Sequence, residues 1–277
     1  MGTVGTSMMR VAAVQMTSGA DVDENLRQAD GLVDAAARDG AELVLLPENF
    51  GLMGLSARDK LAAQEEDGNG VQQAFLARAA QRNRQYVIGG SVPLRSGDPD
   101  HARQSLLVYG PDGARVARYD KIHLFRFTQG SEDYDEAKTI EAGSVPTGFA
   151  ARCGRIGLSI CYDLRFPELY RCLGDLSLIV VPAAFTAPTG EAHWETLLRA
   201  RAIENQCYVL ASAQTGTHPG GRRTWGHSML IDPWGAIVAS RPEGPGIVVG
   251  DVDPARIADV RSRLPALAHR KLGSELY

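Results

Sequence analysis

The sequence contains few lysines, few aromatic residues and few cysteines. Of its 277 residues, 29 are lysine or arginine, but only four of these are lysines, and 6% of the chain is aromatic. The basic residues are scattered and the formal net charge is −4. The chain therefore lacks the basic patch that would attract a nucleic acid or an anionic membrane, and we expect neither as a partner. No apolar run approaches the ~20 residues that a membrane-spanning helix needs.

The cysteines form neither a CxxC pair nor a zinc-binding pattern. They are Cys153, Cys161, Cys172 and Cys207. A chain of this length can build its own core without disulfides, and its first ten residues lack the pattern of a signal peptide. We therefore expect no metal, no other cofactor and a cytoplasmic location. Apart from Cys161, the cysteines are expected to be core residues.

Cys161 follows an apolar run, residues 156–160, that ends abruptly at it. A polar and aromatic segment then leads to Pro167, where a helix could begin. This order predicts a strand, a tight turn and a helix, with the sulfur at the end of a sheet. The helix dipole would favour a thiolate there, which is how a protein presents a nucleophile. The alternative is a small buried hydrophobe, the usual role of a free cysteine.

Two further strand ends carry a charged residue. The run 43–46 is typical of a buried strand, Pro47 interrupts its pairing, and Glu48 follows at its carboxyl end. Lys121 lies between a predicted strand and an aromatic-rich loop. Lysine can shift its pKa and shuttle a proton, so a rare lysine with apolar neighbours is a candidate functional residue. The alternative for Glu48 is a solvated loop carboxylate, and the alternative for Lys121 is a surface cation.

Together these segments resemble the nitrilase, or carbon–nitrogen hydrolase, superfamily. The motifs that carry the resemblance are Pro47-Glu48, Asp120-Lys121-Ile122-His123-Leu124 and Cys161-Tyr162-Asp163-Leu164-Arg165-Phe166-Pro167-Glu168. Strings between residues 185 and 209, with Gly226-His227-Ser228-Met229 and Asp232-Pro233-Trp234-Gly235, resemble its Nit branch, which includes omega-amidases and deaminated-glutathione amidases. The resemblance implies one hydrolase domain over residues 9–270, preceded by a flexible extension, residues 1–8.

The predicted elements alternate between strands and helices, which indicates an α/β fold. Strands are expected at 9–16, 42–46, 86–91, 105–109, 114–119, 156–160, 176–181, 207–212, 229–231 and 236–240. Helices are expected at 23–39, 72–84, 167–173, 191–205 and 254–263. Turns with Pro and Gly at 111–113 and 232–235 mark a hairpin in each half. We infer pseudo-duplicated βαβαββ halves, each forming a sheet covered by helices on one face, and the resemblance implies a four-layer αββα sandwich.

The resemblance also implies a catalytic triad of Glu48, Lys121 and Cys161. Cys161 would form a thioester with the substrate, while Glu48 would take the thiol proton, donate it to leaving ammonia and then activate water. Lys121 and the backbone N–H of Tyr162 would bind the oxyanion. Glu136 lies where the superfamily has a second glutamate that helps to position the site. The alternative is that Glu136 is a solvated loop acid.

Substrate selection is predicted to depend on Arg165 and Thr186. The guanidinium of Arg165 could bind a substrate carboxylate bidentately, and Thr186 could donate its hydroxyl to the same group. The alternative for Arg165 is a structural ion pair with Glu168 or Asp163. We expect a thiol amidohydrolase that releases ammonia from a small carboxylated amide, such as deaminated glutathione or an omega-amide of a 2-oxo acid. The alternatives are a nitrilase, an N-carbamoyl amino acid hydrolase, or a non-catalytic interaction protein that keeps the fold.

An oligomeric assembly is predicted from the C-terminal tail, residues 264–277. The tail carries Leu264, Leu267, Leu272, Leu276 and Tyr277. A segment this apolar should pack on something. The resemblance adds that superfamily members associate through such tails and through the helix after the nucleophile, here 167–173. We therefore expect a homodimer or a larger even-numbered homo-oligomer.

Overall fold

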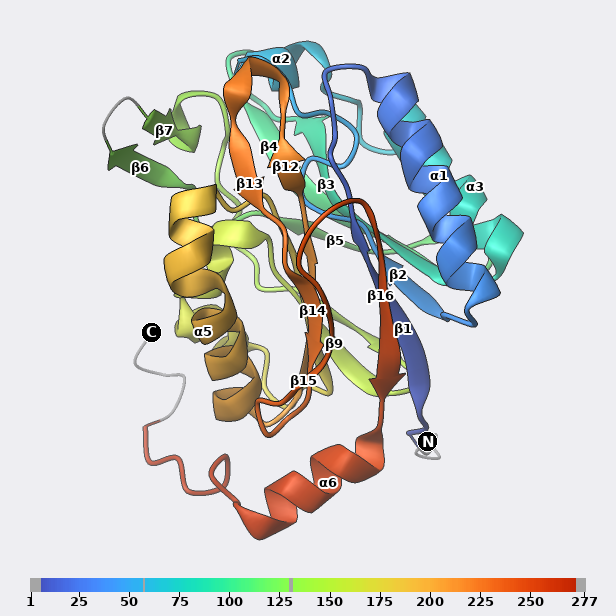
Figure 1. Cartoon of the computed structure of the whole chain (residues 1–277), viewed down its shortest axis with the longest axis vertical. Coiled ribbons are helices and arrows are strands. Elements are labelled where there is room, and N and C mark those ends of the chain that lie inside the picture. Colours follow the sequence, from blue (N-terminus) through green and yellow to red (C-terminus); the bar gives the residue numbers. More distant parts are fainter. Residues whose placement is uncertain (1–5, 57, 130–131, 273–277) are drawn as a thin grey trace.

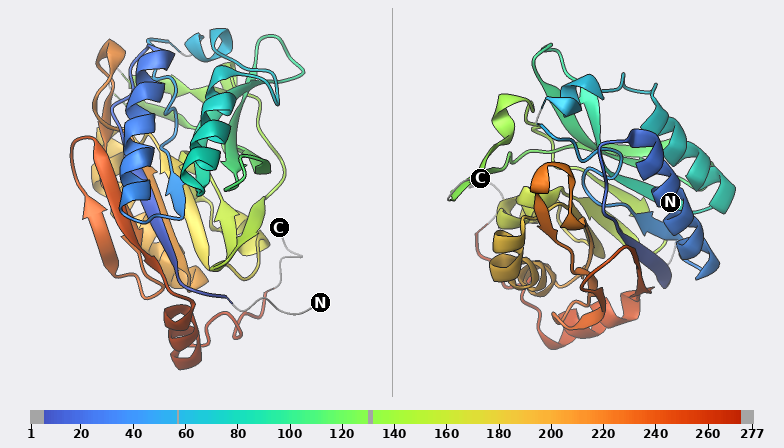
Figure 2. Two further views of the ribbon diagram at one scale, coloured as in Figure 1. Left: turned by 90° about the vertical axis from the view of Figure 1, so that its right-hand side faces the viewer. Right: turned by 45° about the horizontal axis from the view of Figure 1, so that its top comes forward.

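Two six-stranded sheets pack face to face, and helices cover their outer faces (Figure 1). The structure is a computed structural model that describes residues 6–56, 58–129 and 132–272. The right-hand view of Figure 2, with the top brought forward, shows the same order of layers: helices, sheet, sheet, helices. The predicted four-layer αββα sandwich is therefore confirmed. Among the described residues, no helix is long and apolar enough to cross a membrane.

The strands of each sheet lie in a spatial order that differs from their order along the chain. From edge to edge, the first sheet contains β16 (Gly246–Val252), β1 (Met9–Gln15), β2 (Leu43–Leu45), β3 (Tyr86–Arg95), β4 (Ala102–Tyr109) and β5 (Arg115–Asp120). The second contains β15 (Ile237–Arg241), β14 (Ser228–Ile231), β11 (Tyr208–Ala213), β10 (Leu178–Ala183), β9 (Gly154–Leu158) and β8 (Gly148–Ala151). Two small ribbons pair β6 (Arg126–Gln129) with β7 (Glu132–Asp135) and β12 (Thr215–Thr217) with β13 (Arg223–Trp225).

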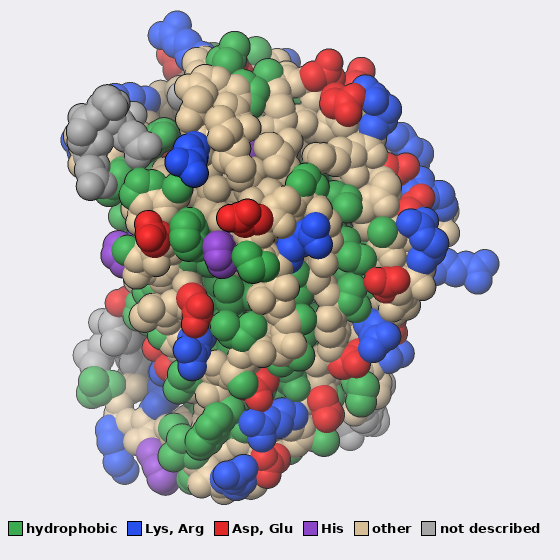
Figure 3. Space-filling view, in the orientation of Figure 1, with side chains coloured by type: hydrophobic (Ala, Val, Ile, Leu, Met, Phe, Trp, Pro, Cys, Tyr) green, Lys and Arg blue, Asp and Glu red, His purple; other side chains and the backbone are tan. Residues whose placement is uncertain are grey.

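The α-helices are α1 (Val22–Arg38), α2 (Asp59–Ala62), α3 (Val71–Asn83), α4 (Pro167–Cys172), α5 (Ala187–Asn205) and α6 (Pro254–Arg263). Short 3-10 turns are η1 (Glu136–Lys138), η2 (Cys161–Arg165) and η3 (Pro219–Gly221). Helices α1 and α3 lie side by side on the first sheet, and Arg82 of α3 forms ion pairs with Asp30 and Asp34 of α1. On the right-hand side of the space-filling view, where α1 and α3 lie, cationic and anionic side chains intermix (Figure 3).

Strand β1 shows why both faces of a sheet are apolar in this fold. Val11 and Ala13 pack in the core between the two sheets, whereas Ala12 and Val14 pack in the core under the helices. Successive side chains of a strand point to opposite faces, so a strand covered on both sides must be apolar throughout. This near-continuous hydrophobic pattern made the central strands recognisable in the sequence.

The duplication of the chain is visible in the order of the strands. The series β1-β2-β3-β4-β5 in one sheet matches β9-β10-β11-β14-β15 in the other. Each series gains a sixth strand at the same edge, where β16 pairs antiparallel with β1 and β8 pairs antiparallel with β9. The expectation that each half forms its own sheet is wrong in this respect, because β16 comes from the end of the chain and completes the first sheet.

Other boundaries differ from the expected ones for local reasons. Helix α5 begins at Ala187 rather than at residue 191, because Pro188 fits the first turn of a helix. The edge strands β8 and β16 were not predicted. Strand β8 has only four residues, whereas β16 carries the apolar run 247–249 and was overlooked. Cys153 and Cys207 are buried as expected, but Cys172, at the end of α4, is exposed.

Only part of each terminal segment lies within the described residues. Ser7 donates a backbone hydrogen bond to Arg152, so the described end of the expected extension contacts the domain. In the C-terminal tail, Leu264 and Leu272 are exposed. Residues 1–5 and 273–277, which include Leu276 and Tyr277 of the predicted tail contact, lie outside the described residues.

Candidate active site

Three strand ends meet in one pocket. Glu48 follows β2, Lys121 follows β5, and Cys161 follows β9, and all three side chains are buried. Glu48 and Cys161 line the pocket, and the Lys121 ammonium contacts Glu48 behind it. The structure therefore brings together residues that lie 73 and 40 positions apart in the sequence.

The carboxylate of Glu48 is held on both oxygens. Lys121 Nζ donates to Oε1 at 2.8 Å, and the backbone N–H of Ala184 donates to Oε2 at 3.0 Å. The approach of β3 to the end of β2 requires a glycine, because a Cβ on Gly90 would lie 2.2 Å from the carbonyl oxygen of Leu46. The sequence thus fixes both the position and the orientation of Glu48.

Lys121 joins two carboxylates. Its ammonium also lies 2.8 Å from Oε2 of Glu136, which in turn accepts from the backbone N–H of Phe125 at 2.8 Å. Burial opposes the charged form, but Glu136 and Glu48 hold the pKa of Lys121 well above its ordinary value. Burial alone would also raise the pKa of Glu136, yet the nearby Lys121 and Lys60 lower it to about 2. Lys121 is therefore a fixed cation, and Glu136 is not a solvated loop acid.

Cys161 lies at the first position of η2, not at the N-terminus of a longer helix. Burial and the neighbouring Glu48 raise the pKa of its thiol well above the usual range, against the opposing charge of Lys121. The expectation of a thiolate stabilised by a helix dipole is therefore wrong. A buried thiol beside a carboxylate keeps its proton at rest and needs a base to remove it.

The backbone at Cys161 is strained, and a buried carboxylate holds it in place. Cys161 has φ +50°, a left-handed backbone conformation that residues other than glycine rarely adopt. Asp163 is fully buried and accepts from the hydroxyl of Tyr119 at 2.7 Å, from the N–H of Ile160 at 2.9 Å and from Nδ1 of His123 at 2.7 Å. Sequence reasoning missed this role of Asp163, because its side-chain partners Tyr119 and His123 come from a remote segment of the chain.

Arg165 lines the pocket next to the thiol. Its guanidinium lies over the rings of Tyr162 and Phe185, 5.7 and 5.4 Å from their centroids, and Nη1 is 3.4 Å from Nδ1 of His193. Among the described residues, no carboxylate lies within 4 Å of it. The alternative of an ion pair with Glu168 or Asp163 is therefore wrong, and the positive charge is free to meet a ligand.

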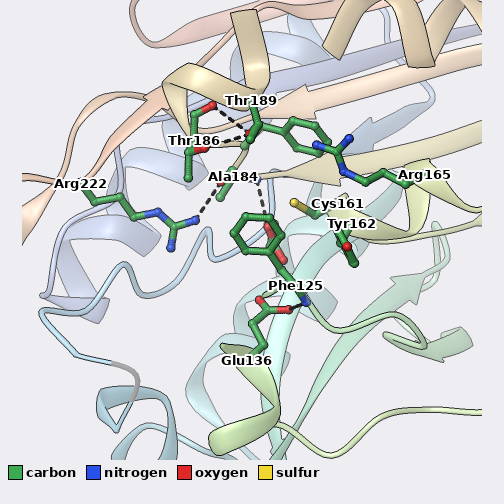
Figure 4. A pocket seen from close by; sticks show the side chains of 11 residues that line it. Phe125, Glu136, Cys161, Tyr162, Arg165, Ala184, Thr186, Thr189 and Arg222 are labelled. Carbon is green, nitrogen blue, oxygen red and sulfur yellow. Dashed lines mark hydrogen bonds between the residues drawn. The ribbon is translucent and has the colours of Figure 1, made fainter. Parts of the chain in front are cut away.

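Thr186 and Tyr162 also line the pocket, as Figure 4 shows. The Thr186 hydroxyl lies 2.9 Å from that of Thr189, which donates to the Thr186 carbonyl at 3.3 Å. In this arrangement the Thr186 hydroxyl has its hydrogen bond inside the protein, so it would have to rotate before it reached a substrate. The role predicted for it remains a prediction.

Two cations near the pocket were not predicted. Arg222 lines the pocket from the side opposite Arg165, and its Nη2 donates to the Ala184 carbonyl at 2.9 Å (Figure 4). Lys60, on α2, lies close enough to Glu136 and Glu48 for their charges to act on it. Neither residue belongs to a recognisable motif, so only the folded chain reveals them.

Comparison with known proteins agrees with the fold and the motifs. Residues 10–262 match the carbon-nitrogen hydrolase family, and the chain belongs to that family. It is 44% identical over 265 residues to deaminated glutathione amidase of Synechocystis, covering 94% of this chain and 97% of that protein. It is 34% identical over 271 residues to omega-amidase NIT2 of Bos taurus, covering 97% of this chain and 96% of that protein.

A solved structure shows the same architecture. The crystal structure of the C. elegans NitFhit protein superposes with a TM-score of 0.89 at 37% identity, covering 99% of this chain and 67% of that one. The predicted membership of the Nit branch is confirmed, and the chain is a carbon–nitrogen hydrolase of the amidase type.

Proposed function

We propose that Cys161, Glu48 and Lys121 hydrolyse the amide bond of a small carboxylated substrate. The observation that carries this proposal is the contact between Glu48 and Lys121 beside a buried thiol. Lys121 lies 2.8 Å from Glu48, and Glu48 faces the thiol closely enough to raise its pKa. A nucleophile that rests as a thiol, a carboxylate that can accept its proton and a fixed cation are the parts that acyl transfer requires.

The reaction proceeds in two halves. Glu48 takes the thiol proton as the sulfur of Cys161 attacks the carbonyl carbon, and Lys121 with the backbone N–H of Tyr162 stabilises the oxyanion. The C–N bond then breaks, and the leaving nitrogen takes the proton from Glu48. In the second half Glu48 removes a proton from water, and the water oxygen attacks the thioester carbon. The C–S bond then breaks, the acid leaves, and the sulfur of Cys161 takes the proton back from Glu48. Glu136 keeps Lys121 charged and in place throughout.

The substrate we propose is a 2-oxo amide with a carboxylate near the scissile bond, as in deaminated glutathione or an omega-amide of a 2-oxo acid. The names of the two curated relatives support this class. Arg165 would bind the carboxylate, because its guanidinium lines the pocket and meets no carboxylate of the described chain. A charge-assisted hydrogen bond to it contributes ~1.5–3 kcal/mol, or about 10- to 150-fold in selectivity.

The test is turnover of a panel of 2-oxo amides, with product release measured for each. Wild type should prefer each acid over its methyl ester, and Cys161→Ala should be inactive. Arg165→Met should lose the preference while keeping its melting temperature, and Arg155→Met on β9, an exposed arginine, is the matched control. Full activity of the Cys161→Ala protein would exclude the thiol mechanism.

We also propose that the enzyme is cytoplasmic and acts as an even-numbered homo-oligomer. A reducing compartment suits a working thiol, and all four cysteines are free. Exposed apolar side chains gather at the end of α5, the β14–β15 turn and the start of the tail: Ile203, Trp234 and Leu264. Sedimentation at micromolar concentration should show species larger than the 29.8 kDa chain. A chain that sediments only at that mass would refute the assembly.

A further inference from the structure

Asn49, the residue that follows Glu48, has a left-handed backbone. Its φ is +59°, a conformation that asparagine adopts more readily than most residues but that is still uncommon outside glycine. The side chain is buried and does not line the pocket. Strain of this kind persists where surrounding contacts fix it, and it is concentrated at functional sites. The contacts of Asn49 therefore indicate its role.

Two buried side chains hold Asn49. Its backbone N–H donates to Oγ of Ser91 at 2.8 Å, and its Oδ1 accepts from Nε2 of Gln104 at 2.6 Å. Nε2 of Gln104 also donates to Oγ of Ser91 at 2.9 Å, so the three residues form a closed ring of hydrogen bonds. In a buried and closed network each hydrogen bond restricts the geometry of the others.

Strand β3 is irregular at the point where it supplies Ser91. Its pairing with β4 shifts register between Gly89 and Val92, so two residues of β3 lie opposite one residue of β4. Irregularities of this kind are common next to active sites, where they redirect a side chain. In this protein the irregular segment places Ser91 against Asn49, at the end of β2.

Gln104 links the segments that carry Glu48 and Lys121. Its backbone carbonyl accepts from the N–H of Lys121 at 2.9 Å, while its side chain holds Asn49. Its Oε1 is buried and, among the residues that the structure describes, meets no hydrogen-bond donor. A buried acceptor without a donor is costly, so the stability of the fold alone does not account for an amide at this position.

We propose that Asn49 and Gln104 are positioning residues that set the orientation of Glu48 toward the thiol. This inference rests on the proposed function, in which Glu48 is the base. The network fixes the peptide after Glu48, and Nε2 of Gln214 donates to the carbonyl of Glu48 itself at 3.1 Å. The backbone from which the carboxylate extends is therefore held in place. Displacing a catalytic group by ~1 Å can cost about 10²-fold in rate.

Two variants remove the contact between the amides and leave the backbone as it is. Asn49→Gly deletes the side chain, and glycine adopts a positive φ without strain. Gln104→Met deletes Nε2 but keeps the length of the side chain and the carbonyl that holds Lys121. Each variant should lower kcat roughly 10- to 100-fold, because the base is misplaced. KM should change little, since neither side chain lines the pocket.

The double variant tests whether the two residues act as one unit. If the bond between their amides orients Glu48, the double variant should lose no more kcat than the more severe single variant. Losses that multiply would show two independent effects and would refute the shared role.

A second measurement needs no substrate. Glu48 must remove the thiol proton before Cys161 can react with iodoacetamide, so both variants should slow the alkylation of Cys161. Peptide mass spectrometry in a Cys172→Ser background follows this reaction at Cys161 alone. The rate reports the placement of the base whether or not the right amide has been found.

Two controls carry the same kinds of change away from the pocket. Gln73→Met removes another buried amide, whose Nε2 donates to Oε2 of Glu65 and to the carbonyl of Glu66. Arg84→Gly replaces the left-handed residue at the end of α3. Neither residue lines the pocket. Whatever they do to the melting temperature, both controls should keep the wild-type kcat and alkylation rate.

The outcomes separate this inference from the function on which it rests. If wild type hydrolyses no amide of the panel, the proposed function fails, and the alkylation rates still test the positioning of Glu48. If Asn49→Gly and Gln104→Met lose only stability, with kcat and alkylation unchanged, the positioning role is refuted while the amidase function stands. If one of them does not fold, Ser91→Ala, which removes the third member of the ring, takes its place and should show the same losses.

Discussion

Lys121 Nζ lies 2.8 Å from Oε1 of Glu48, and both side chains are buried. A buried ion pair is stable only when its partners have their remaining hydrogen bonds satisfied. In this site Glu136 supplies a second carboxylate to Lys121, and the Ala184 N–H occupies the other oxygen of Glu48. The same contacts that stabilise the pair also direct Glu48 toward the thiol, so the stability of the site and its chemistry are linked.

Removing Lys121 should therefore harm both activity and stability. Lys121→Ala leaves two buried carboxylates without their cation, and breaking a buried pair costs ~3–5 kcal/mol. Loss of the oxyanion donor should lower kcat at least ~10²-fold. Denaturant unfolding and steady-state kinetics measure the two effects. Lys271→Ala, at an exposed position, is the control and should change neither.

Lys121→Arg tests whether the geometry of the ammonium matters. A planar guanidinium does not fit a site built for a compact ammonium between two carboxylates, so arginine should not rescue kcat. A variant with near-normal kcat would show that the reaction needs only a positive charge near the thiol.

Cys161→Ser should fold and lose nearly all turnover, because a hydroxyl is a far poorer nucleophile than a thiol in this site. Chemical labelling gives an independent measurement. The exposed Cys172 should react with iodoacetamide whether or not substrate is present, whereas labelling of Cys161 should be slowed by substrate. In a Cys172→Ser background, inactivation should follow modification of Cys161. Activity lost before Cys161 is modified would contradict its assignment as nucleophile.

Tyr119→Phe tests the support of the strained nucleophile. It removes the hydroxyl that donates to buried Asp163, which should cost ~1–3 kcal/mol of stability. Because Asp163 also holds the N–H of Ile160, next to Cys161, kcat should fall while KM changes little. Tyr86→Phe, which keeps its ring contact with Phe149, is the control. A loss of stability with unchanged kcat would limit Asp163 to a structural role.

Strand ends and turns could be predicted from neighbouring residues, whereas contacts between distant segments of the chain could not. The strand ends that carry Glu48 and Cys161 could be found because an apolar run stops at a charged or reactive residue. The hairpin turn at 232–235 could be found from its Pro and Gly, and Gly235 indeed adopts φ +85°, which favours glycine. The place of β16 beside β1 could not be predicted, since this pairing joins the two ends of the chain.

The electrostatics of the site also depend on distant residues. The resting state of Cys161 is set by burial and by Glu48, and a sequence pattern shows neither. Arg222 and Lys60 lie outside every motif, and only folding brings them to the pocket. Motifs therefore identified the triad residues and Arg165, while the two further cations beside them were found only in the structure.

The ion pair of Glu136 with Lys121 should make the fold sensitive to acid. Because the pKa of Glu136 is lowered from 4.5 to about 2 in the folded protein, its contribution to stability is fully present above pH 4.5 and is lost as the pH falls toward 2. That contribution is on the order of 3 kcal/mol.

Glu136→Gln lacks this contribution, so the difference in unfolding free energy between wild type and variant should shrink as the pH falls from 5 to about 3. Other lowered carboxylates, such as Asp34 and Asp67, are present in both proteins and cancel. Urea unfolding at several pH values measures the difference, and a gap that stays constant over this range would show that Glu136 is not held ionised by Lys121.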